Sequence, residues 1–568
     1  HAIVHDLGWD RLRPVQELTI DAALDGANVV VLAPTAGGKT EASLFPVLSQ
    51  ILADEAKPVA ALYLCPVRAL LNNQEARVRK YAQMVGLDAF KWHGDVADSS
   101  RGRFRREPAH VLMTTPESIE VMLLSAKTDA RALFAGLRTV IVDEVHAFAG
   151  DDRGAHLASL LERLTAFCGA DLQRIGLSAT VGNPDVIGSW LAGSSRRPFR
   201  LVDPPRPVAR RELRIERVDD LEGAVPAITR QALGRKSLVF VESRAGAEKV
   251  AEALKGHDVE VFVHHGAISR ADRELAEDRF ERGTNTAIVA TSTMELGIDV
   301  GDLDQVLQID APSRVAGFLQ RVGRTGRRAG TVSNCTFYCV TAEAMLQAVS
   351  LLRLADRGWV EDVVPVQRAW HILAHQVLAL TLEHGGVSRH RVLGAVGAAA
   401  PFRGFTETDT MRLVDTMVER EILHEADGLL SFGPKGERIY GRRNFFELYA
   451  VFSAPAMVKV MHGRQDVGTV DSRFVQGHDP EKGPLSFRLA GRAWQAVGTD
   501  LDRGVMQVVP APSGRIPSWL GQGGLLSFAL VQEMKRTLRE PGPEAAWLSD
   551  GAARDLAGLR DEYDGLVD

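Results

Sequence analysis

The stretch VVVLAPTAGGKT, residues 29–40, decides the fold of the first part of the chain. An apolar β-branched run precedes a loop with two glycines, and Lys39 and Thr40 then open a helical segment. In that order, backbone N–H groups converge on phosphate oxygens, Lys39 adds a positive charge and Thr40 can ligate Mg²⁺. Ala33 stands where the general pattern has its first glycine. The stretch predicts a phosphate-binding loop between a strand and a helix; the alternative is an ordinary glycine turn.

The alternation of apolar runs and helical stretches continues outward from this loop. In the first 200 residues, the runs lie at 29–33, 59–64, 110–115 and 139–144. A Pro- and Arg-rich stretch from Phe199 is expected to be an interdomain linker. Beyond it, apolar runs return at 237–241, 259–265, 286–291 and 305–310. The fold class is therefore α/β and multidomain, with two parallel-sheet domains in tandem.

The chain changes character from about residue 346. One helix carries its apolar face at Trp370, Leu373, Val377 and Leu380. A second helix is expected from about Thr408 to Arg420, followed by a hairpin turn at Asp427 and Gly428, which together predict a winged helix. Residues 450–509 are strand-like with frequent turn signals, which predicts a small β-sandwich or barrel. The expected domains are 1–205, 206–345, 346–442 and 443–568, the last β-rich with a helical tail.

Composition restricts the setting in which the protein works. Its 568 residues contain 67 Lys plus Arg against 73 Asp plus Glu, so a polyanion would have to bind in a local groove. Four scattered cysteines indicate a reducing compartment, and the cytoplasm is expected. Cys335 and Cys339 lack further ligands at metal-binding spacing and are interpreted as core residues. No apolar run reaches the length of a membrane span, so no membrane association is expected.

The second chemical signal is VIVDEVHAF, an apolar strand that ends in Asp143 and Glu144, with His146 two residues later. A strand delivers such carboxylates to the carboxyl edge of a parallel sheet. Asp143 is then placed to hold Mg²⁺, and Glu144 to orient or deprotonate an attacking water. An acidic pair alone is more often a solvated strand end, but its position about 100 residues after a phosphate loop makes it a strong signal.

The third signal is QRVGRTGR at residues 320–327, in the second α/β domain. The three-residue spacing of Arg321, Arg324 and Arg327 predicts that they lie along one side of a helix. Planar guanidinium groups suit the spread charge of a phosphoryl transition state, as an arginine finger does. The alternative is a basic helix that rests on nucleic-acid phosphates.

Together these elements resemble the superfamily 2 helicases of the DExH type, here DEVH, over about residues 8–345. The resemblance implies two RecA-like domains with ATP and Mg²⁺ bound between them. For catalysis it implies Lys39, Asp143, Glu144, His146, Gln320, Arg324 and Arg327, with Ser178 and Thr180 of LSAT coupling hydrolysis to domain movement. For ATP it implies Arg13, Gln16, Pro34, Thr35, Ala36, Gly37, Gly38, Lys39, Thr40, Glu41, Gly297 and Asp299, and for Mg²⁺ it implies Thr40 and Asp143.

Further matching stretches look like the nucleic-acid grip of that superfamily. They supply hydroxyls, backbone N–H groups and arginines that would hold a single strand by its phosphates and sugars without reading bases. The implied residues are Arg68, His93, Gly94, Thr115, Pro116, Glu117, Ser243, Arg244, His265, Thr291 and Ser292.

HGDV, TTPESIEVML, VDEVHAFAGDDRGAHLASLLERL, FRLAGRAWQAV and PSWLGQGG look like the Lhr (large helicase-related) core. This family implies a monomer that moves 3′ to 5′ on single-stranded DNA and unwinds duplexes or RNA:DNA hybrids, in DNA repair or genome defence. Trp494 and Trp519 are candidates for stacking on bases, although a Trp preceded by apolar strand residues is more often a core residue. Behind residue 345 the chain is shorter than typical Lhr cores, which leaves open how far its C-terminal domains enclose the strand.

Two other functions fit the same sequence. One is a DExH RNA helicase, which also uses a winged helix. The other is an ATP-dependent remodelling or scaffold subunit of a repair or defence complex that separates no strands and depends on partner proteins.

Overall fold

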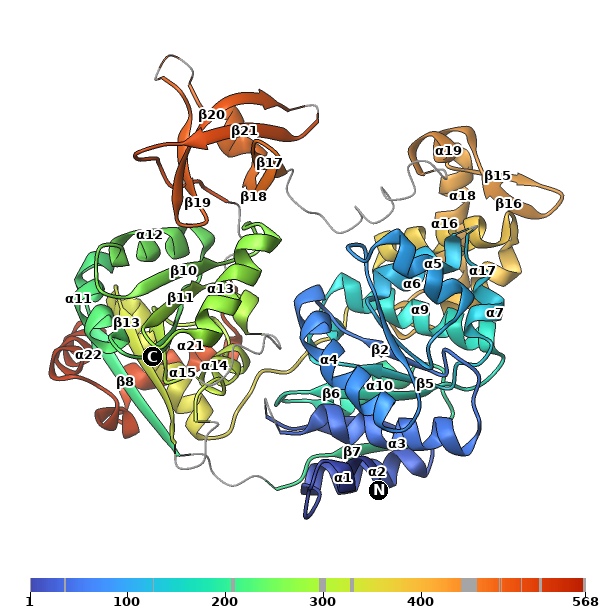
Figure 1. The fold of residues 1–568 in the computed structure, drawn as a ribbon, viewed down its shortest axis with the longest axis horizontal. Coiled ribbons are helices and arrows are strands. Elements are labelled where there is room, and N and C mark those ends of the chain that lie inside the picture. The colour runs from blue at the N-terminus through green and yellow to red at the C-terminus, as the bar shows by residue number, and fades with distance from the viewer. Residues whose placement is uncertain are drawn as a thin grey trace. The chain divides into compact units, whose positions relative to one another are not determined.

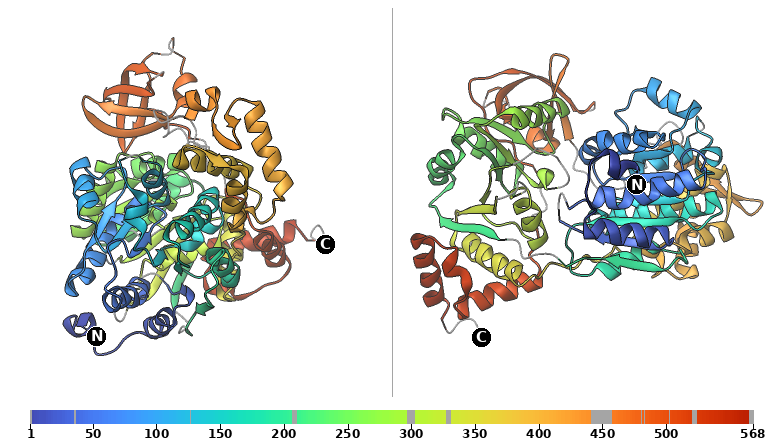
Figure 2. Two further views of the ribbon diagram at one scale, coloured as in Figure 1. Left: turned by 90° about the vertical axis from the view of Figure 1, so that its right-hand side faces the viewer. Right: turned by 60° about the horizontal axis from the view of Figure 1, so that its bottom comes forward.

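A computed structural model describes the protein at residues 2–34, 37–125, 127–205, 210–295, 303–326, 331–440, 457–479, 481, 483–501, 503–519 and 524–564. The chain divides into two compact units. Unit 1 contains residues 1–205 and 362–453, and unit 2 contains residues 206–361 and 454–568. Figures 1 and 2 show that each unit has a sheet flanked by helices.

The sheet of unit 1 has seven parallel strands in the order β3-β4-β2-β5-β6-β1-β7. The strands are β1 Asn28–Leu32, β2 Ala61–Leu64, β3 Ala89–Trp92, β4 Val111–Thr114, β5 Thr139–Val142, β6 Gln173–Ser178 and β7 Phe199–Val202. The central strands β1, β2, β5 and β6 are buried along their whole length. Burial on both faces explains why they appear in the sequence as continuous apolar runs rather than as alternating ones.

Helices cover both faces of this sheet and form two separate cores. The helices are α1 Ala2–Asp6, α2 Pro14–Leu24, α3 Lys39–Ala53, α4 Arg68–Met84, α5 Asp98–Arg106, α6 Pro116–Leu124, α7 Ala130–Phe134, α8 Val145–Ala149, α9 Asp152–Cys168 and α10 Pro184–Ala192. Val29 and Val31 of β1 pack with α1 to α4, whereas Val30 and Leu32 pack with α5 to α10. The alternation of side chains along a strand produces this division.

The rest of unit 1 is a winged helix. It consists of α16 Trp370–His384, β14 Val387–Ser388, α17 Arg389–Gly397, the 3-10 turn η2 Ala400–Phe402, α18 Glu407–Glu419, β15 Leu423–Ala426, β16 Leu429–Phe432 and α19 Pro434–Tyr440. The three strands are antiparallel in the order β14-β16-β15. Asp427 and Gly428, with φ of 51° and 73°, form the hairpin turn that their sequence predicts.

The sheet of unit 2 has six parallel strands in the order β10-β11-β9-β12-β13-β8. The strands are β8 Arg211–Arg217, β9 Lys236–Phe240, β10 Glu260–His264, β11 Thr286–Ala290, β12 Gln305–Ile309 and β13 Ser333–Cys339. The helices are α11 Leu221–Ala232, α12 Arg244–Leu254, α13 Arg270–Arg282, the 3-10 turn η1 Ser292–Met294, α14 Val315–Val322 and α15 Ala342–Asp356. The prediction of two tandem parallel-sheet domains is confirmed.

A curled sheet of mixed strands follows, with the order β18-β17-β21-β20-β19. We call it, together with α20 Ser472–Gln476, the β-module. Its strands are β17 Met457–His462, β18 Gln465–Asp471, β19 Ser486–Leu489, β20 Arg492–Asp500 and β21 Val505–Pro510. Val458, Val460, Phe487 and Met506 are buried inside it, which gives the β-module its own small core.

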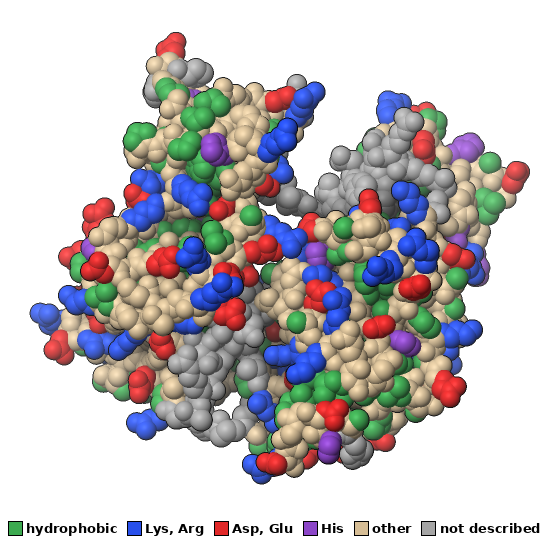
Figure 3. Space-filling view, viewed as in Figure 1, with side chains coloured by type: hydrophobic (Ala, Val, Ile, Leu, Met, Phe, Trp, Pro, Cys, Tyr) green, Lys and Arg blue, Asp and Glu red, His purple; other side chains and the backbone are tan. Residues whose placement is uncertain are grey.

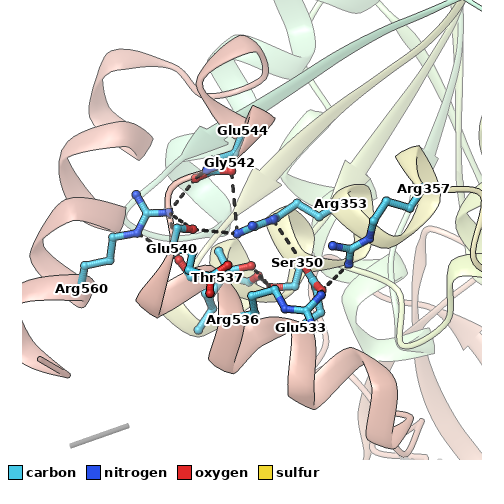
Figure 4. A network of polar contacts seen from close by, with 11 residues as sticks. Ser350, Arg353, Arg357, Glu533, Arg536, Thr537, Glu540, Gly542, Glu544 and Arg560 are labelled. Atoms are coloured by element: carbon cyan, nitrogen blue, oxygen red, sulfur yellow. Dashed lines mark hydrogen bonds and ion pairs between the residues drawn. The ribbon is translucent and has the colours of Figure 1, made fainter. Parts of the chain in front are cut away.

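The C-terminal helices return to the sheet of unit 2. They are α21 Phe528–Arg539 and α22 Asp550–Glu562, joined through the 3-10 turn η5 Pro543–Ala546. Arg353 of α15 pairs with Glu533 of α21, with Nε and Oε1 3.1 Å apart (Figure 4). Arg560 of α22 pairs with Glu544, with Nη2 and Oε1 2.6 Å apart. The helical tail therefore belongs with the second parallel sheet.

The structure refines two expectations. The stretch from Phe199 was expected to be a linker, but its first residues form the edge strand β7, because Phe199–Val202 can pair with β1. Helix α15, expected to open the winged-helix domain at residue 346, packs on β8 and β13 within unit 2. Among the described helices, none is long and apolar enough to cross a membrane.

Candidate functional site

The carboxyl ends of four neighbouring strands bring the predicted site residues of unit 1 to one edge of its sheet. Leu32 at the end of β1 lies opposite Ser178 at the end of β6. Leu64 at the end of β2 lies opposite Val142 at the end of β5. Because the strands are parallel, the phosphate loop, the DEVH segment and LSAT all begin at this edge.

The predicted phosphate loop folds around its own lysine. Lys39 is 8% exposed, and its Nζ donates to the carbonyls of Ala33 at 2.7 Å and Pro34 at 3.3 Å. A Cβ on Gly37 would stand 2.8 Å from the Pro34 carbonyl, and a Cβ on Gly38 would stand 2.7 Å from Gln16 Nε2. Both glycines are thus required by close approach, and Gly38 also by its φ of 89°. Thr35 and Ala36 lie outside the described residues.

Arg13 and Gln16 lie beside this loop, as the resemblance implies. The backbone N–H of Arg13 donates to Gln16 Oε1 at 2.9 Å, at the start of α2. Gln16 is only 2% exposed, so this bond fixes its amide where the loop passes. On the other side of α3, Glu41 accepts from the Tyr81 hydroxyl at 3.0 Å. Burial, followed by the Glu41 charge, raises the pKa of Tyr81 to about 12.

Asp143 is buried at the end of β5 and is held by two donors. The Tyr63 hydroxyl of β2 donates to its Oδ2 at 2.8 Å, and the backbone N–H of Glu144 donates to Oδ1 at 3.0 Å. Burial, followed by the charge of Glu144, raises the pKa of Asp143 to about 6. Tyr63 is a further site residue that the sequence motifs do not contain, since it comes from a strand 80 residues earlier.

Glu144 precedes α8 in a left-handed conformation, with φ of 48°. Its Oε2 is buried and accepts no hydrogen bond within the described part of the chain. The Nδ1 of His146 is 3.5 Å from this oxygen and 2.9 Å from Ser178 Oγ. Burial lowers the pKa of His146. Thr180 is half-buried two residues beyond β6.

This arrangement fits a nucleotide triphosphate with Mg²⁺. The loop glycines leave no room for side chains, the Lys39 ammonium donates to two backbone carbonyls, and Thr40 lies beside it at the start of α3. A buried carboxylate oxygen of Glu144 without a donor is a group that a water or a metal-bound ligand would satisfy. Asp143 supplies the hard oxygen ligand that Mg²⁺ prefers.

The predicted grip residues of unit 1 lie in loops at the same sheet edge. Arg68 opens α4, is exposed, and donates from Nη1 to both carboxylate oxygens of Asp95 at 3.1 Å. His93 is buried, with Nε2 3.2 Å from Asn72 Oδ1, whereas Gly94 is exposed. Thr115 precedes α6 with its Oγ1 3.3 Å from Ser118 Oγ, and Pro116 is the first residue of that helix.

Arg153 of α9 joins two of these grip segments and is absent from the predicted set. Its Nε donates to Glu117 Oε1 at 2.7 Å, and its Nη1 donates to the Pro66 carbonyl at 2.6 Å. Burial alone would raise the pKa of Glu117, but the Arg153 guanidinium holds it below its ordinary value. Arg153 and His156 are spaced by three residues, as are Glu117 and Glu120, and this matched helical spacing could have revealed the pairing.

In unit 2, the predicted grip residues begin helices. Ser243 caps α12 by accepting from the Gly246 N–H at 2.9 Å, and Arg244 is half-buried beside it. Burial lowers the pKa of Arg244. Thr291 is buried before η1, and Ser292 is exposed at its start. Gly297 and Asp299 lie outside the described residues.

His265 and Trp494 are buried by structural contacts, and Trp519 packs beside them. His265 is fully buried, with Nε2 3.2 Å from Glu248 Oε1 and its ring packed edge-on to Trp519 at 5.5 Å. Trp494 is 4% exposed and donates from Nε1 to the Leu489 carbonyl at 3.0 Å. Trp494 belongs to the core of the β-module, whereas Trp519 is half-buried and packs against that core.

The predicted row of arginines on one helix is corrected by the structure. Helix α14 carries Gln320 and Arg321 but ends at Val322. Arg324 stands in the turn that follows, where Gly326 has φ of 70°, and Arg327 lies outside the described residues. Arg321 forms ion pairs within unit 2, with Glu242 at 2.6 Å and with Glu295. Arg324 donates to the Glu295 carbonyl.

Comparison with known proteins gives the same division of the chain. The DEAD/DEAH box helicase family matches residues 13–187, and the helicase conserved C-terminal domain matches residues 216–329. The Lhr helicase/uracil glycosylase of Escherichia coli is 28% identical, over 90% of this chain and 38% of its own length. The ATP-dependent helicase Lhr-Core of Methanothermobacter thermautotrophicus is 28% identical, over 93% of this chain and 65% of its own length. The chain thus spans less than two thirds of either relative.

A solved structure of Mycobacterium smegmatis helicase Lhr bound to ssDNA and AMP-PNP is similar over 99% of this chain and 73% of that protein. The TM-score is 0.74 and the sequence identity is 25%. The likeness therefore extends beyond the two parallel sheets into the winged helix, the β-module and the helical tail.

Proposed function

Because this chain belongs to the Lhr-like superfamily 2 helicases, we propose that it hydrolyses ATP to move 3′ to 5′ on single-stranded DNA. In moving, it displaces DNA or RNA paired to that strand, and it works as a monomer in repair or genome defence. The observation that supports this most is the sheet edge from which the loop to Lys39 leaves β1, and at which Asp143 follows β5 and Ser178 ends β6.

The residues of this edge suit the binding of ATP through its phosphates. Lys39 would leave the carbonyls of Ala33 and Pro34 to bind the β and γ phosphates. Thr40 and Asp143 would hold Mg²⁺, which when bound neutralises phosphate charge. Tyr63 keeps Asp143 in one orientation by its hydrogen bond at 2.8 Å. Gln16 and Arg13 would lie toward the base.

Glu144 is the residue we assign to the attacking water. Its buried Oε2 accepts no hydrogen bond within the described residues, so it can accept one from a water without first breaking another. His146 connects this carboxylate to Ser178 and hence to LSAT, since its Nδ1 lies 3.5 Å from Glu144 Oε2 and 2.9 Å from Ser178 Oγ. Through this contact, hydrolysis at Glu144 would change the position of LSAT and so couple to domain movement.

The second domain would contribute Arg324 and Arg327 to the phosphoryl group. Grip residues on both domains, such as Arg68 and Ser243, would hold the strand by its backbone. Alternate closing and opening of the two domains then moves them along the strand. A single strand that binds both domains favours the closed state, so single strands should stimulate the ATPase.

The test is displacement of tailed duplexes by wild type, Glu144→Gln and Glu222→Gln. Glu222 is exposed on α11, far from any motif in sequence, and controls for the loss of one carboxylate. The duplexes carry 3′ or 5′ tails of DNA or RNA and displaced strands of DNA or RNA. We expect displacement from 3′-tailed DNA by wild type and Glu222→Gln, and loss of about 100-fold or more in Glu144→Gln, as for removal of a general base.

Other results would select another function. Displacement that requires RNA in the tail would establish an RNA helicase, since the 2′-hydroxyl is then read. Displacement from 5′ tails alone would reverse the proposed direction. Strand-stimulated ATPase without displacement of any duplex would favour a remodelling subunit that depends on protein partners, and ATPase unaffected by any strand would contradict the motor itself.

A further inference from the structure

The outer face of α5 carries hydroxyl and guanidinium groups and no carboxylate. Ser99, Ser100, Arg103 and Arg106 are all exposed on this nine-residue helix. Arg103 lies four residues after Ser99, three after Ser100 and three before Arg106, so the four share one broad face. We call these four residues the α5 face.

The two exposed arginines of this face are not neutralised. Arg101, on another side of α5, pairs with Asp98 at 2.7 Å. Within the described part of the chain, no ion pair involves Arg103 or Arg106. The segment 98–107 has four arginines against Asp98 and Glu107, in a chain whose net charge is -6. Lys and Arg side chains also gather over this part of unit 1 in Figure 3.

The orientation of the helix is fixed from its inner side. The guanidinium groups of Arg101 and Arg105 lie over the Trp92 ring, 5.9 and 5.1 Å from its centroid. Phe104 is 1% exposed and stacks on Phe90, with ring centroids 4.7 Å apart. These contacts anchor one side of α5 on the sheet and leave the α5 face directed away from the core.

The α5 face continues the proposed grip of unit 1. Helix α5 begins four residues after Gly94. Trp92, whose ring contacts Arg101 and Arg105, is the last residue of β3 and directly precedes His93. Arg68, on the neighbouring loop, is already paired with Asp95. Among the described residues, Arg103 and Arg106 form no ion pair and follow that loop in the sequence on α5, and a polyanion is the partner that their charge fits.

We propose that the α5 face binds the phosphodiester backbone of single-stranded nucleic acid, next to the segment held by the His93 and Gly94 loop. This inference rests on the proposed function and extends it, because it lengthens the strand contact of the first motor domain beyond the motif loops. The contact is electrostatic and independent of base sequence. Each phosphate neutralised on a single strand contributes about 0.7 to the slope of log K against log salt concentration.

The experiment measures the salt dependence of binding of a fluorescent single strand to four proteins. They are wild type, Arg103→Ala/Arg106→Ala, Arg103→Lys/Arg106→Lys and Arg196→Ala/Arg200→Ala. Arg196 precedes β7 and Arg200 lies in it, both exposed, on the opposite edge of the same sheet. Their replacement removes the same amount of positive charge. A blunt duplex of equal length is measured in parallel.

We expect the slope to fall by about 1.4 in Arg103→Ala/Arg106→Ala. It should be restored by the lysine pair and unchanged in Arg196→Ala/Arg200→Ala. ATPase without a strand should stay as in wild type, since neither arginine belongs to the nucleotide site. A slope equal to that of wild type or of the β7 control, or a change confined to the duplex, would overturn the proposal. Failure of wild type to bind strands at all would instead count against the proposed function.

Discussion

Each parallel-sheet domain uses a buried glutamate to hold the module packed on it, the winged helix in unit 1 and the β-module in unit 2, but the two glutamates bind different partners. In unit 1, Glu120 of α6 accepts from Arg163 at 2.6 Å and His156 at 2.8 Å, and from Gln376 of the winged helix at 3.2 Å. In unit 2, Glu248 of α12 accepts from the backbone N–H groups of Ala490 at 2.7 Å and Gly491 at 2.9 Å in the β-module.

The winged helix is therefore attached by side-chain charges. Arg163 also pairs with Glu383 of α16 and donates to Gln376 Oε1 at 3.1 Å. Burial alone would raise the pKa of Glu120, yet Arg163 and His156 hold it well below its ordinary value. Such a buried network depends on the identity and the protonation of every member.

The β-module, by contrast, is attached mainly by main-chain groups. Besides the two bonds to Glu248, Ser269 N–H donates to the Val467 carbonyl at 3.1 Å, and Thr469 N–H donates to the Ala267 carbonyl at 2.7 Å. Most residue types supply these groups, so substitutions other than at Gly468, where a Cβ would stand 2.2 Å from the Ala267 carbonyl, should be tolerated better here than in the winged-helix attachment. Single side-chain substitutions should therefore cost more stability at the winged-helix attachment than at the β-module attachment.

The network around Glu120 also has the donor types of a metal site. One ligand atom each from Glu120, His156 and His375 lies within 4.8 Å of the others. However, the Gln376 amide already donates to Glu120 Oε2 at 3.2 Å and approaches His375 Nδ1 at 3.1 Å, and Arg163 supplies the positive charge. We assign the cluster to the attachment of the winged helix.

The largest expected effect is that of Arg163→Met. It leaves two nearly inaccessible carboxylates, Glu120 and Glu383, without their cation. Loss of one partner of a buried ion pair costs about 3–5 kcal/mol. This loss of stability is measured by unfolding unit 1 in urea and by amide exchange in α16. Arg412→Met, at an exposed position of α18, is the control. Equal stability of the two variants would show that side-chain charge does not hold the winged helix.

The next effect depends on pH. Burial lowers the pKa of His375 to about 4, whereas an unfolded His titrates near 6.5. The unfolded state then binds more protons between these values, so stability is lost as the pH falls through this window, by about 3 kcal/mol in full. His375→Asn should remove this loss. Parallel stability profiles of wild type and His375→Asn from pH 7 to pH 4 would show that His375 does not sense pH.

A smaller effect is expected for Glu248→Ala. The substitution deprives two backbone N–H groups of their acceptor, at a cost of about 2 kcal/mol because water can reach the half-buried turn. Amide exchange at Ala490 and Gly491 should become faster, while Glu248→Gln, which keeps one acceptor oxygen, should lie between. If exchange at these amides stays as slow as in wild type, the β-module is held by the other main-chain bonds alone.

The smallest effect is expected for Arg488→Ala. Arg488 pairs with Glu252 at the margin of the β-module, where 38% of the glutamate side chain is exposed. Exposed pairs contribute less than about 1 kcal/mol and are weakened by salt. Thermal unfolding at low and high salt concentration measures the contribution. A loss as large as that of Glu248→Ala would mean that side-chain charge also holds this module.

The sequence predicts those parts of the molecule that are local. Strand, loop and helix follow one another at Lys39, and Asp143 ends its strand as expected, since apolar runs and glycines control both. The end of α14 was missed, although Gly323 and Gly326 signal it. Tyr63 and Glu248 could not be predicted, because their partners are distant in sequence and meet only in the packed fold.

The returning tail of unit 2 has a consequence for solubility. Strand β8 is at the edge of its sheet, and an open edge is a template for pairing with other chains. Ile215 of β8 donates its N–H to the Trp547 carbonyl at 2.7 Å and accepts from Ser549 N–H at 3.0 Å. These bonds occupy part of that edge. A chain cut after Pro510 would lose them and should aggregate through β8, even though every motif of both motor domains would still be present.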